Sequence, residues 1–122
     1  MAEVHKILIF LKRRPGMSRE EFRDYYENRH VPLCMKYMNG ARRYFRRYID
    51  ALPDPSTGKP VELAFDVITE VWFDDRAAFD TALKYAGSGI LPQEVIDDEE
   101  RVFDRPKSRF TWVTECETDL ST

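Results

Sequence analysis

Cysteine and histidine are scarce in this sequence of 122 residues, which contains two of each. Two thiols are too few for the disulfide framework of a small secreted domain, so we expect Cys34 and Cys116 to be free cysteines in a reducing cytoplasm. Neither residue type is clustered at metal-ligand spacing, and the chain has no glycine-rich phosphate loop and no serine nucleophile elbow. We therefore expect no metal cluster and no nucleotide cofactor held by a phosphate loop.

Long apolar runs and an excess of positive charge are also missing. No segment approaches the roughly 20 apolar residues that span a bilayer, and the N-terminus has no secretory-signal pattern. The formal net charge is −3, which argues against a general nucleic-acid-binding protein. The sequence therefore predicts a cytoplasmic protein with no membrane partner and no nucleic-acid partner.

The residues that are plentiful are apolar and aromatic. Apolar residues make up 43% of the chain and include eight Phe, six Tyr and two Trp, which is enough for one hydrophobic core. A proline- and glycine-rich stretch at residues 50–60 predicts a surface loop, but neither of its flanks is large enough to fold alone. We expect a single domain over residues 1–122.

One segment has the pattern of a capped amphipathic helix. Ser18 and Glu21 have the spacing of a capping box, in which each side chain accepts a hydrogen bond from the other residue's backbone amide. Phe22, Tyr26 and His30 follow at intervals of four, which places them along one face of the helix. One of the two histidines is thus expected on the inward-facing side.

Pro32 sets the expected end of this helix. Proline lacks an amide hydrogen and disfavours helical geometry in the preceding residue, so we expect the helix to end about at His30. There the helix dipole favours the protonated imidazole and burial favours the neutral one, which brings the pKa of His30 near neutrality. Such a group suits proton abstraction next to a carbonyl or protonation of a leaving hydroxyl. The equal alternative is a histidine that packs in the core and hydrogen-bonds a carbonyl near Pro32.

The order of the expected elements is strand, helix, strand, strand, helix, strand, with one short extra helix before the last strand. This order predicts an α+β, ferredoxin-like βαββαβ fold, in which an antiparallel sheet carries two helices on one face. The strands are expected at Val4–Lys12, Ala41–Ile49, Ala64–Phe73 and Arg109–Glu115, and the helices begin at Ser18, at Asp74 or Asp75, and at Pro92.

The second face of such a sheet needs a cover. We expect it to carry large apolar residues of the first, third and last strands, and a second copy of the chain is the economical cover. The sequence therefore predicts a homodimer whose sheets pack against each other.

The third strand contributes two candidate site carboxylates. Asp66, Ile68, Glu70 and Trp72 share one strand face. If that face meets the helices, the two carboxylates point into an apolar pocket, where they must pair or take up protons, and either one can orient His30 or act as the opposite acid or base. We favour the pocket for one of them, with Ile68 and Trp72 beside it. If the face lies at a strand end or at the dimer contact, they are ordinary charges.

Two tyrosines of the helix are candidate substrate-binding residues. Tyr25 and Tyr26 can each offer a phenol to a bound carbonyl, with Phe22 beside them. Core packing is the alternative, and we expect it for at least one of the tyrosines.

Three segments resemble the EthD family of the dimeric α+β barrel superfamily. They are KRRPGMSREEFRDYYENRHVPL, FDVITEVWFDDRAAFDTAL and DDEERVFDRPKSRFTWVTE, and with the first strand they extend from Lys6 to Glu115. The resemblance implies a ferredoxin-like subunit that pairs into a barrel. The family's helix-ending histidine corresponds to His30, and its acidic and aromatic strand positions correspond to Asp66, Glu70 and Trp72.

The resemblance is less specific about function than about fold. Relatives look like small cofactor-free enzymes that isomerise muconolactones or carry out dehydration and decarboxylation in aromatic polyketide pathways, and others have no assigned activity. Lactone-isomerising relatives use a cysteine on the third strand. The third strand of this chain has no cysteine, which weakens the hypothesis that the protein is a lactone isomerase.

The function that we predict is that of an enzyme: a cofactor-independent lyase or isomerase. It would carry out dehydration, decarboxylation or proton transfer on a small cyclic or aromatic metabolite bound between sheet and helices, with His30 as general acid or base. One alternative is a cofactor-free monooxygenase of an electron-rich phenol. The other is a non-catalytic dimeric protein that binds a small molecule.

Overall fold

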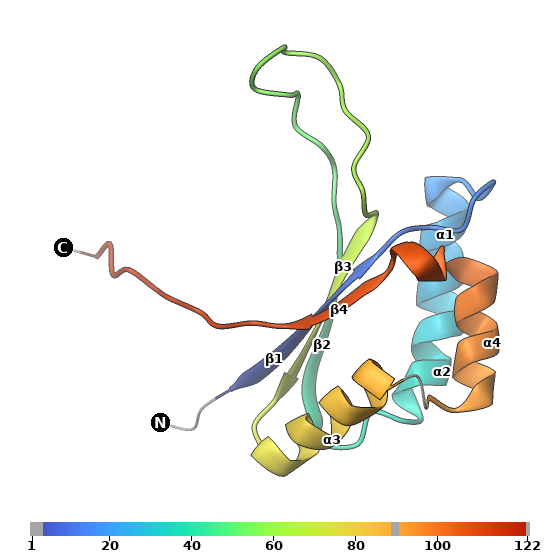
Figure 1. Cartoon of the computed structure of the whole chain (residues 1–122), viewed down its shortest axis with the longest axis vertical. Coiled ribbons are helices and arrows are strands. Elements are labelled where there is room, and N and C mark those ends of the chain that lie inside the picture. Colours follow the sequence, from blue (N-terminus) through green and yellow to red (C-terminus); the bar gives the residue numbers. More distant parts are fainter. Residues whose placement is uncertain (1–3, 89–90, 122) are drawn as a thin grey trace.

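The computed structural model describes residues 4–88 and 91–121. Within these residues the strands form one antiparallel sheet with the order β2-β3-β1-β4. This is the predicted α+β, ferredoxin-like arrangement (Figure 1). The strands are β1 (His5–Leu11), β2 (Ala41–Tyr48), β3 (Val67–Phe73) and β4 (Arg109–Trp112).

The helices gather on one side of the sheet, to the right of and below the strands in Figure 1. None of the helices in the described part of the chain is long and apolar enough to cross a membrane. The helical elements are α1 (Arg19–Tyr25), η1 (Tyr26–His30), α2 (Val31–Met35), α3 (Arg76–Ser88), α4 (Gln93–Val102) and η2 (Arg105–Lys107).

The first helix begins as expected but does not end as expected. Ser18 Oγ accepts a hydrogen bond from the Glu21 amide at 3.0 Å, and Glu21 Oε1 accepts one from the Ser18 amide at 3.1 Å, so the capping box is confirmed. The end at His30 is wrong, because α2 continues the helical run to Met35.

A wide turn lets the helix pass Pro32. The five residues of η1 form a π-helical turn, in which the Val31 amide donates to the Tyr26 carbonyl. Pro32 then lies in the first turn of α2, where a missing amide hydrogen and a fixed φ are tolerated. His30 therefore lies in the middle of a helical run, so the helix C-terminal dipole does not act on it.

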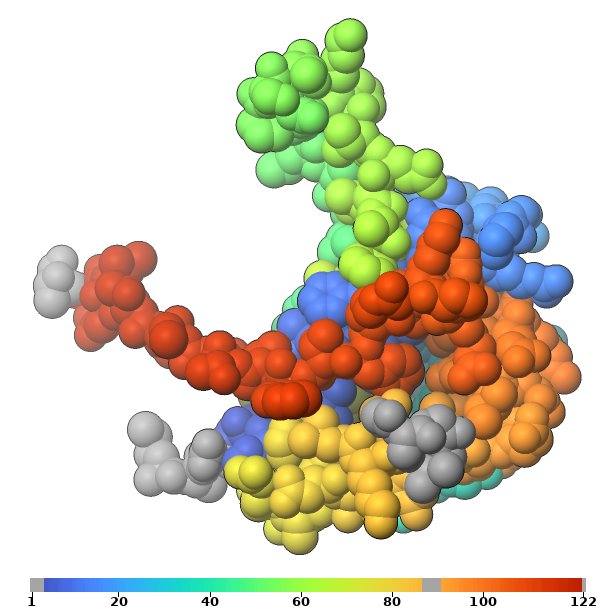
Figure 2. Space-filling model, in the orientation of Figure 1, coloured from blue at the N-terminus to red at the C-terminus, as the bar shows by residue number. Residues whose placement is uncertain are grey.

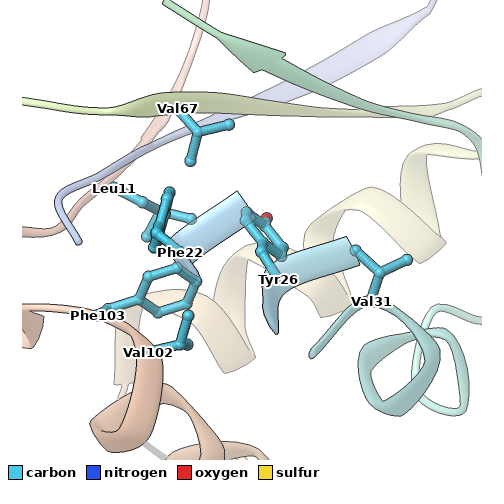
Figure 3. Packing of buried hydrophobic residues seen from close by; sticks show 7 residues of the cluster. All are labelled: Leu11, Phe22, Tyr26, Val31, Val67, Val102 and Phe103. Carbon is cyan, nitrogen blue, oxygen red and sulfur yellow. The ribbon is translucent and has the colours of Figure 1, made fainter. Parts of the chain in front are cut away.

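The core consists of two clusters between the helices and the sheet. The second cluster joins α3 to the sheet through Ile7, Val71, Phe73 and Phe79. The first cluster surrounds α1 and η1 and is shown in Figure 3. Its buried members are Leu11, Phe22, Tyr26, Val31, Val67, Val102 and Phe103.

None of the helices among the described residues lies against the opposite face of the sheet (Figure 1). Along β3, alternate residues are fully buried toward the helices, whereas Ile68, Glu70 and Trp72 point to the open face and are only half-buried. The Trp72 ring lies 5.4 Å from the ring of Phe45 on β2, with Lys6 Nζ 4.3 Å from its centroid. Aromatic and apolar side chains therefore do lie on this face.

We expected the last strand to supply apolar side chains to the open face, and this expectation is wrong. Phe110 pairs with Ile9, and both line the space between sheet and helices. Side chains alternate along a strand, so Thr111, paired with Leu8, points to the open face. The aromatic contribution comes instead from Phe45 on the second strand.

Two segments extend away from the packed body on the side of the open face. Figures 1 and 2 show the connection between β2 and β3 and the chain after β4 standing clear of the other elements. Leu52 and Leu120 on these segments are 84% and 87% exposed. The connection between β2 and β3 is the predicted surface loop.

Phe22 should be a main determinant of stability. It is 1% exposed and contacts Tyr26, Tyr48 and Phe103 edge-on or tilted. Phe22→Ala should lower the free energy of unfolding by about 3–5 kcal/mol, because it removes buried apolar surface and leaves a cavity. Urea denaturation at equal protein concentration measures this loss. Leu52→Ala is the matched control and should change stability by less than about 0.5 kcal/mol; equal effects would contradict the assignment of the core.

Candidate active site

A cavity of about 790 Å³ lies between the sheet and the helices. This volume lies within the range of about 300–1,000 Å³ that is usual for small-molecule sites. Its walls are mainly apolar and come from all strands of the sheet, from η1 and α2, from α3 and from α4. The polar side chains at its wall include His30, Cys34, Tyr44, Thr69 and Glu99.

His30 is held at the cavity wall by a buried carboxylate. The imidazole is 3% exposed, and its Nδ1 lies 2.7 Å from Oδ2 of Asp98 on α4, which is 6% exposed. A carboxylate only accepts hydrogen bonds, so Nδ1–H donates to Asp98 and the lone pair of neutral His30 is on Nε2. Tyr25 donates to the other carboxylate oxygen at 2.5 Å, which leaves both oxygens of Asp98 engaged.

The protonation of His30 follows from its surroundings. Burial lowers the pKa of His30 below its ordinary value of 6.5, and the hydrogen bond and charge of Asp98 offset part of this effect. The neutral imidazole therefore predominates at neutral pH. This is the form of a general base, and Asp98 can stabilise the imidazolium that forms when the base takes up a proton.

Cys34 lies one helical turn after His30. Its Sγ is 3.2 Å from His30 Nε2, and its side chain also faces the cavity. Burial, together with the negative charges of Glu99 and Asp98, raises the pKa of the Cys34 thiol to about 12. The sulfur therefore carries its proton, and S–H donates a weak hydrogen bond to Nε2.

Glu99 places a second titratable group at the wall. It follows Asp98 on α4, is 7% exposed, and has Arg105 Nε 3.3 Å from its Oε1. Burial raises the pKa of Glu99 to about 7, although Arg105 acts against the shift. Near neutral pH this carboxyl is thus divided between its acid and base forms, as suits a proton donor or acceptor.

Two tyrosines give the wall neutral hydroxyl groups. Tyr26 is 2% exposed and its hydroxyl is hydrogen-bonded to that of Thr69 on β3. Burial raises the pKa of Tyr26 and of Tyr44, so both phenols stay protonated. Tyr25 does not line the cavity, but it touches the site through Asp98.

The carboxylates that we expected beside His30 lie elsewhere. Asp66 accepts hydrogen bonds at 2.8 Å from the backbone amide and from the guanidinium of Arg13, before β3 begins. Glu70 lies on the open face, where it accepts from Trp72 Nε1 at 2.5 Å and pairs with Arg47 at 3.4 Å. The prediction that one of them faces the pocket is wrong, because β3 turns its apolar residues and Thr69 toward the helices.

Three other expected pocket residues are also outside the cavity. Ile68 and Trp72 share the open face with Glu70. Phe22 belongs to the core and does not line the cavity. Of the predicted residues, the structure brings His30 and Tyr26 together at the wall, with Tyr25 behind them.

Sequence reasoning missed Asp98, Glu99 and Cys34. Asp98 and Glu99 stand between Val95 and Val102 at helical spacing, so they lie on the buried stripe of α4. A run of four acidic residues concealed this, since such a run usually indicates a solvated face. Cys34 is four residues after His30 and would have been placed on the same face if the helix had been continued through Pro32.

A metal is not suggested by the geometry. Among residues 4–88 and 91–121, no group of three or more His, Cys, Asp or Glu side chains could hold a metal ion. The groups at the wall that can take part in chemistry are an oriented base, a carboxyl that titrates near neutrality, a thiol and neutral hydroxyls.

Comparison with known proteins gives a family and a fold. Residues 14–106 match the family profile described as EthD domain. No curated protein matches the sequence significantly. An EthD family protein from Bacillus halodurans c-125 superposes with a TM-score of 0.58 at 20% identity, covering 92% of this chain and 99% of that one.

Two further solved structures share the fold. A dimeric ferredoxin-like protein of unknown function from Jannaschia sp. CCS1 has a TM-score of 0.55 at 12% identity, covering 93% of this chain and all of that one. A hydroxynitrile lyase from Passiflora edulis has a TM-score of 0.53 at 10% identity, covering 97% of this chain and all of that one.

The titration of His30 tests the geometry of the site. In a His5→Gln variant a single imidazole remains, and ¹⁵N NMR should show it titrating below pH 6.5 with the proton on Nδ1 in the neutral form. Asp98→Asn in the same background should lower the midpoint further, because the partner that favours the imidazolium is lost. A midpoint above 6.5, or a neutral tautomer with the proton on Nε2, would contradict the assignment.

Proposed function

We propose that this chain, which belongs to the EthD domain family, is a cofactor-independent lyase or isomerase of a small cyclic or aromatic metabolite. The observation that carries the proposal is the buried His30–Asp98 pair, whose Nε2 accepts only the weak hydrogen bond of the Cys34 thiol at the wall of an apolar cavity. A base in this position is separated from bulk water and held in one tautomer.

The reaction begins with proton abstraction. A hydroxyl or an acidic C–H of the bound metabolite displaces the thiol of Cys34 from Nε2, since S–H is a weak donor. Nε2 takes up the proton and Asp98 stabilises the resulting imidazolium. The proton is then returned at another carbon in an isomerisation, or to a leaving group in an elimination.

Glu99 supplies the second proton site that such chemistry needs. It lines the same cavity, and with a pKa of about 7 it can donate a proton while His30 accepts one. Asp66 and Glu70 are not part of this proposal. Asp98 takes the orienting role and Glu99 the acid–base role that we first assigned to carboxylates of β3.

The cavity wall favours a planar or ring-shaped ligand. Phe73, Phe103 and Phe110 line it together with Tyr26 and Tyr44. Aromatic rings prefer offset or edge-on contacts with other rings. One fold neighbour is a hydroxynitrile lyase, which supports the view that this fold accommodates lyase chemistry.

The proposed enzyme is a homodimer. Fold neighbours are described as dimeric, and the open sheet face of this chain carries Phe45, Ile68 and Trp72. A second copy covering this face would bury these side chains, and the pocket would remain on the far side of each sheet.

The dimer can be tested by a charge on the open face. Trp72→Glu should convert the dimer to a monomer, because it removes the large aromatic side chain from the interface and replaces it with a charge that is costly to bury. Size-exclusion chromatography with light scattering measures the mass. Met35→Glu, at a 63% exposed position on α2, is the matched control and should stay dimeric. A dimeric Trp72→Glu protein would exclude this face as the interface.

Proton abstraction by His30 can be tested with a small bicyclic ketone, 1-indanone, in deuterated water. The wild-type protein should speed the incorporation of deuterium next to the carbonyl, as seen by mass spectrometry. His30→Gln should slow this exchange by about 10²- to 10⁴-fold, the usual contribution of a general base.

Near-ultraviolet circular dichroism should show that His30→Gln folds like the wild type. Exchange by a folded His30→Gln protein at the wild-type rate would overturn the proposed base. Binding of 1-indanone to the wild type without exchange would favour a protein that binds small molecules without turning them over. Oxygen consumption with a phenol in the cavity would favour the monooxygenase.

A further inference from the structure

Cys34, His30 and Asp98 form a continuous chain of hydrogen-bonded groups at the cavity wall. Cys34 Sγ is 3.2 Å from His30 Nε2, and His30 Nδ1 is 2.7 Å from Asp98 Oδ2. A nucleophile, a base and a carboxylate that orients the base have this order in enzymes that use covalent catalysis. Tyr25 fixes the carboxylate from its other side.

The helical run brings the first two groups to one face. His30 is the last residue of η1, and Cys34 follows four residues later in α2. Residues four apart in an α-helix are neighbours on the surface. Both side chains line the cavity, so a bound molecule can reach the sulfur and the base together.

The resting state of this thiol resembles that of an activated serine. Burial and the two acidic residues of α4 raise the pKa of Cys34 to about 12, so the thiolate is not the resting form. The neutral imidazole beside it can remove the proton while the sulfur attacks. The titratable groups acting on the sulfur or coupled to it are His30, Tyr26, Tyr44, Asp98 and Glu99.

We propose that Cys34 is a nucleophile that adds to α,β-unsaturated carbonyl compounds bound in the cavity. The sulfur lone pair forms a C–S bond to the β-carbon, and the π electrons of the alkene move to the carbonyl as an enolate. The thiol proton passes to His30 Nε2 and is then delivered to the α-carbon. The product is a thioether, and no oxidant or reductant is consumed.

This inference shares the cavity and the base of the proposed function, but it concerns a different bond. The inference is tested by the mass of an adduct on Cys34. The proposed function is tested by the incorporation of deuterium into 1-indanone. Exchange without an adduct would overturn only the inference. An adduct without exchange would overturn only the proposed function.

The experiment uses a neutral, planar electrophile, N-phenylmaleimide, with the Cys116→Ser variant. Cys116 is exposed and would react as well, and its replacement leaves Cys34 as the single thiol of the chain. Peptide mapping should place one adduct on Cys34. Reaction rates are measured by intact-protein mass spectrometry between pH 6 and pH 8.5. Their pH dependence shows whether a base-assisted thiol or a thiolate attacks.

The pH profile separates a base-assisted thiol from an ordinary one. Neutral His30 is present throughout the upper part of this range, so the Cys34 rate should level off above about pH 6.5. The rate of a reference thiol, N-acetylcysteine, should rise about tenfold per pH unit until its thiolate predominates. A Cys34 rate that climbs in parallel with the reference would overturn the proposal, as would the absence of an adduct.

Two substitutions test whether His30 and Asp98 assist the attack by Cys34. His30→Gln in the Cys116→Ser background should slow the reaction at pH 7 by about 10²- to 10⁴-fold. Asp98→Asn should also slow it, because the amide no longer fixes the Nδ1–H tautomer. Labelling at an unchanged rate in a folded His30→Gln protein would overturn the proposal. If neither variant folds, the pH profile of the Cys116→Ser protein decides alone.

Discussion

The hydrogen bond between His30 and Asp98 links the two halves of the site. One partner comes from the π turn after the first helix and the other from the helix before the last strand, 68 residues later in the chain. Both are almost completely buried, so each would be costly without the other. The tautomer of the imidazole and the direction of Nε2 depend on this bond, which also ties α4 to η1.

The fold was predictable because period and alternation are local properties of the sequence. The apolar face of β3 repeats every second residue from Val67 to Phe73, and the capping box marks the start of α1. The path past Pro32 was not predictable in this way. Whether proline ends a helix depends on the width of the preceding turn, which propensity does not encode. The contact between Phe45 and Trp72 on the open face was not predictable either, because it depends on the register between β2 and β3.

The site was less predictable than the fold, because it joins residues distant in sequence. His30 and Tyr26 could be placed on an inward face from their spacing alone. Their carboxylate partner could not, since Asp66, Glu70, Asp98 and Glu99 all lie next to apolar residues and differ only in what packs on them. Packing places Asp98 and Glu99 inside and pairs Asp66 with Arg13. The resemblance to the EthD family agrees with the fold, but the strand carboxylates that it implied, Asp66 and Glu70, do not line the cavity.

The π turn from Tyr26 to His30 has an evolutionary implication. A π turn contains one residue more than the α-helical turn it replaces, so it can arise from the insertion of a single codon. Removing one residue would rotate everything after it by about 100° relative to Phe22 and Tyr26. Family members that lack this extra residue are therefore expected to hold a different side chain where Cys34 stands, and to have diverged in chemistry by insertion or deletion rather than by substitution.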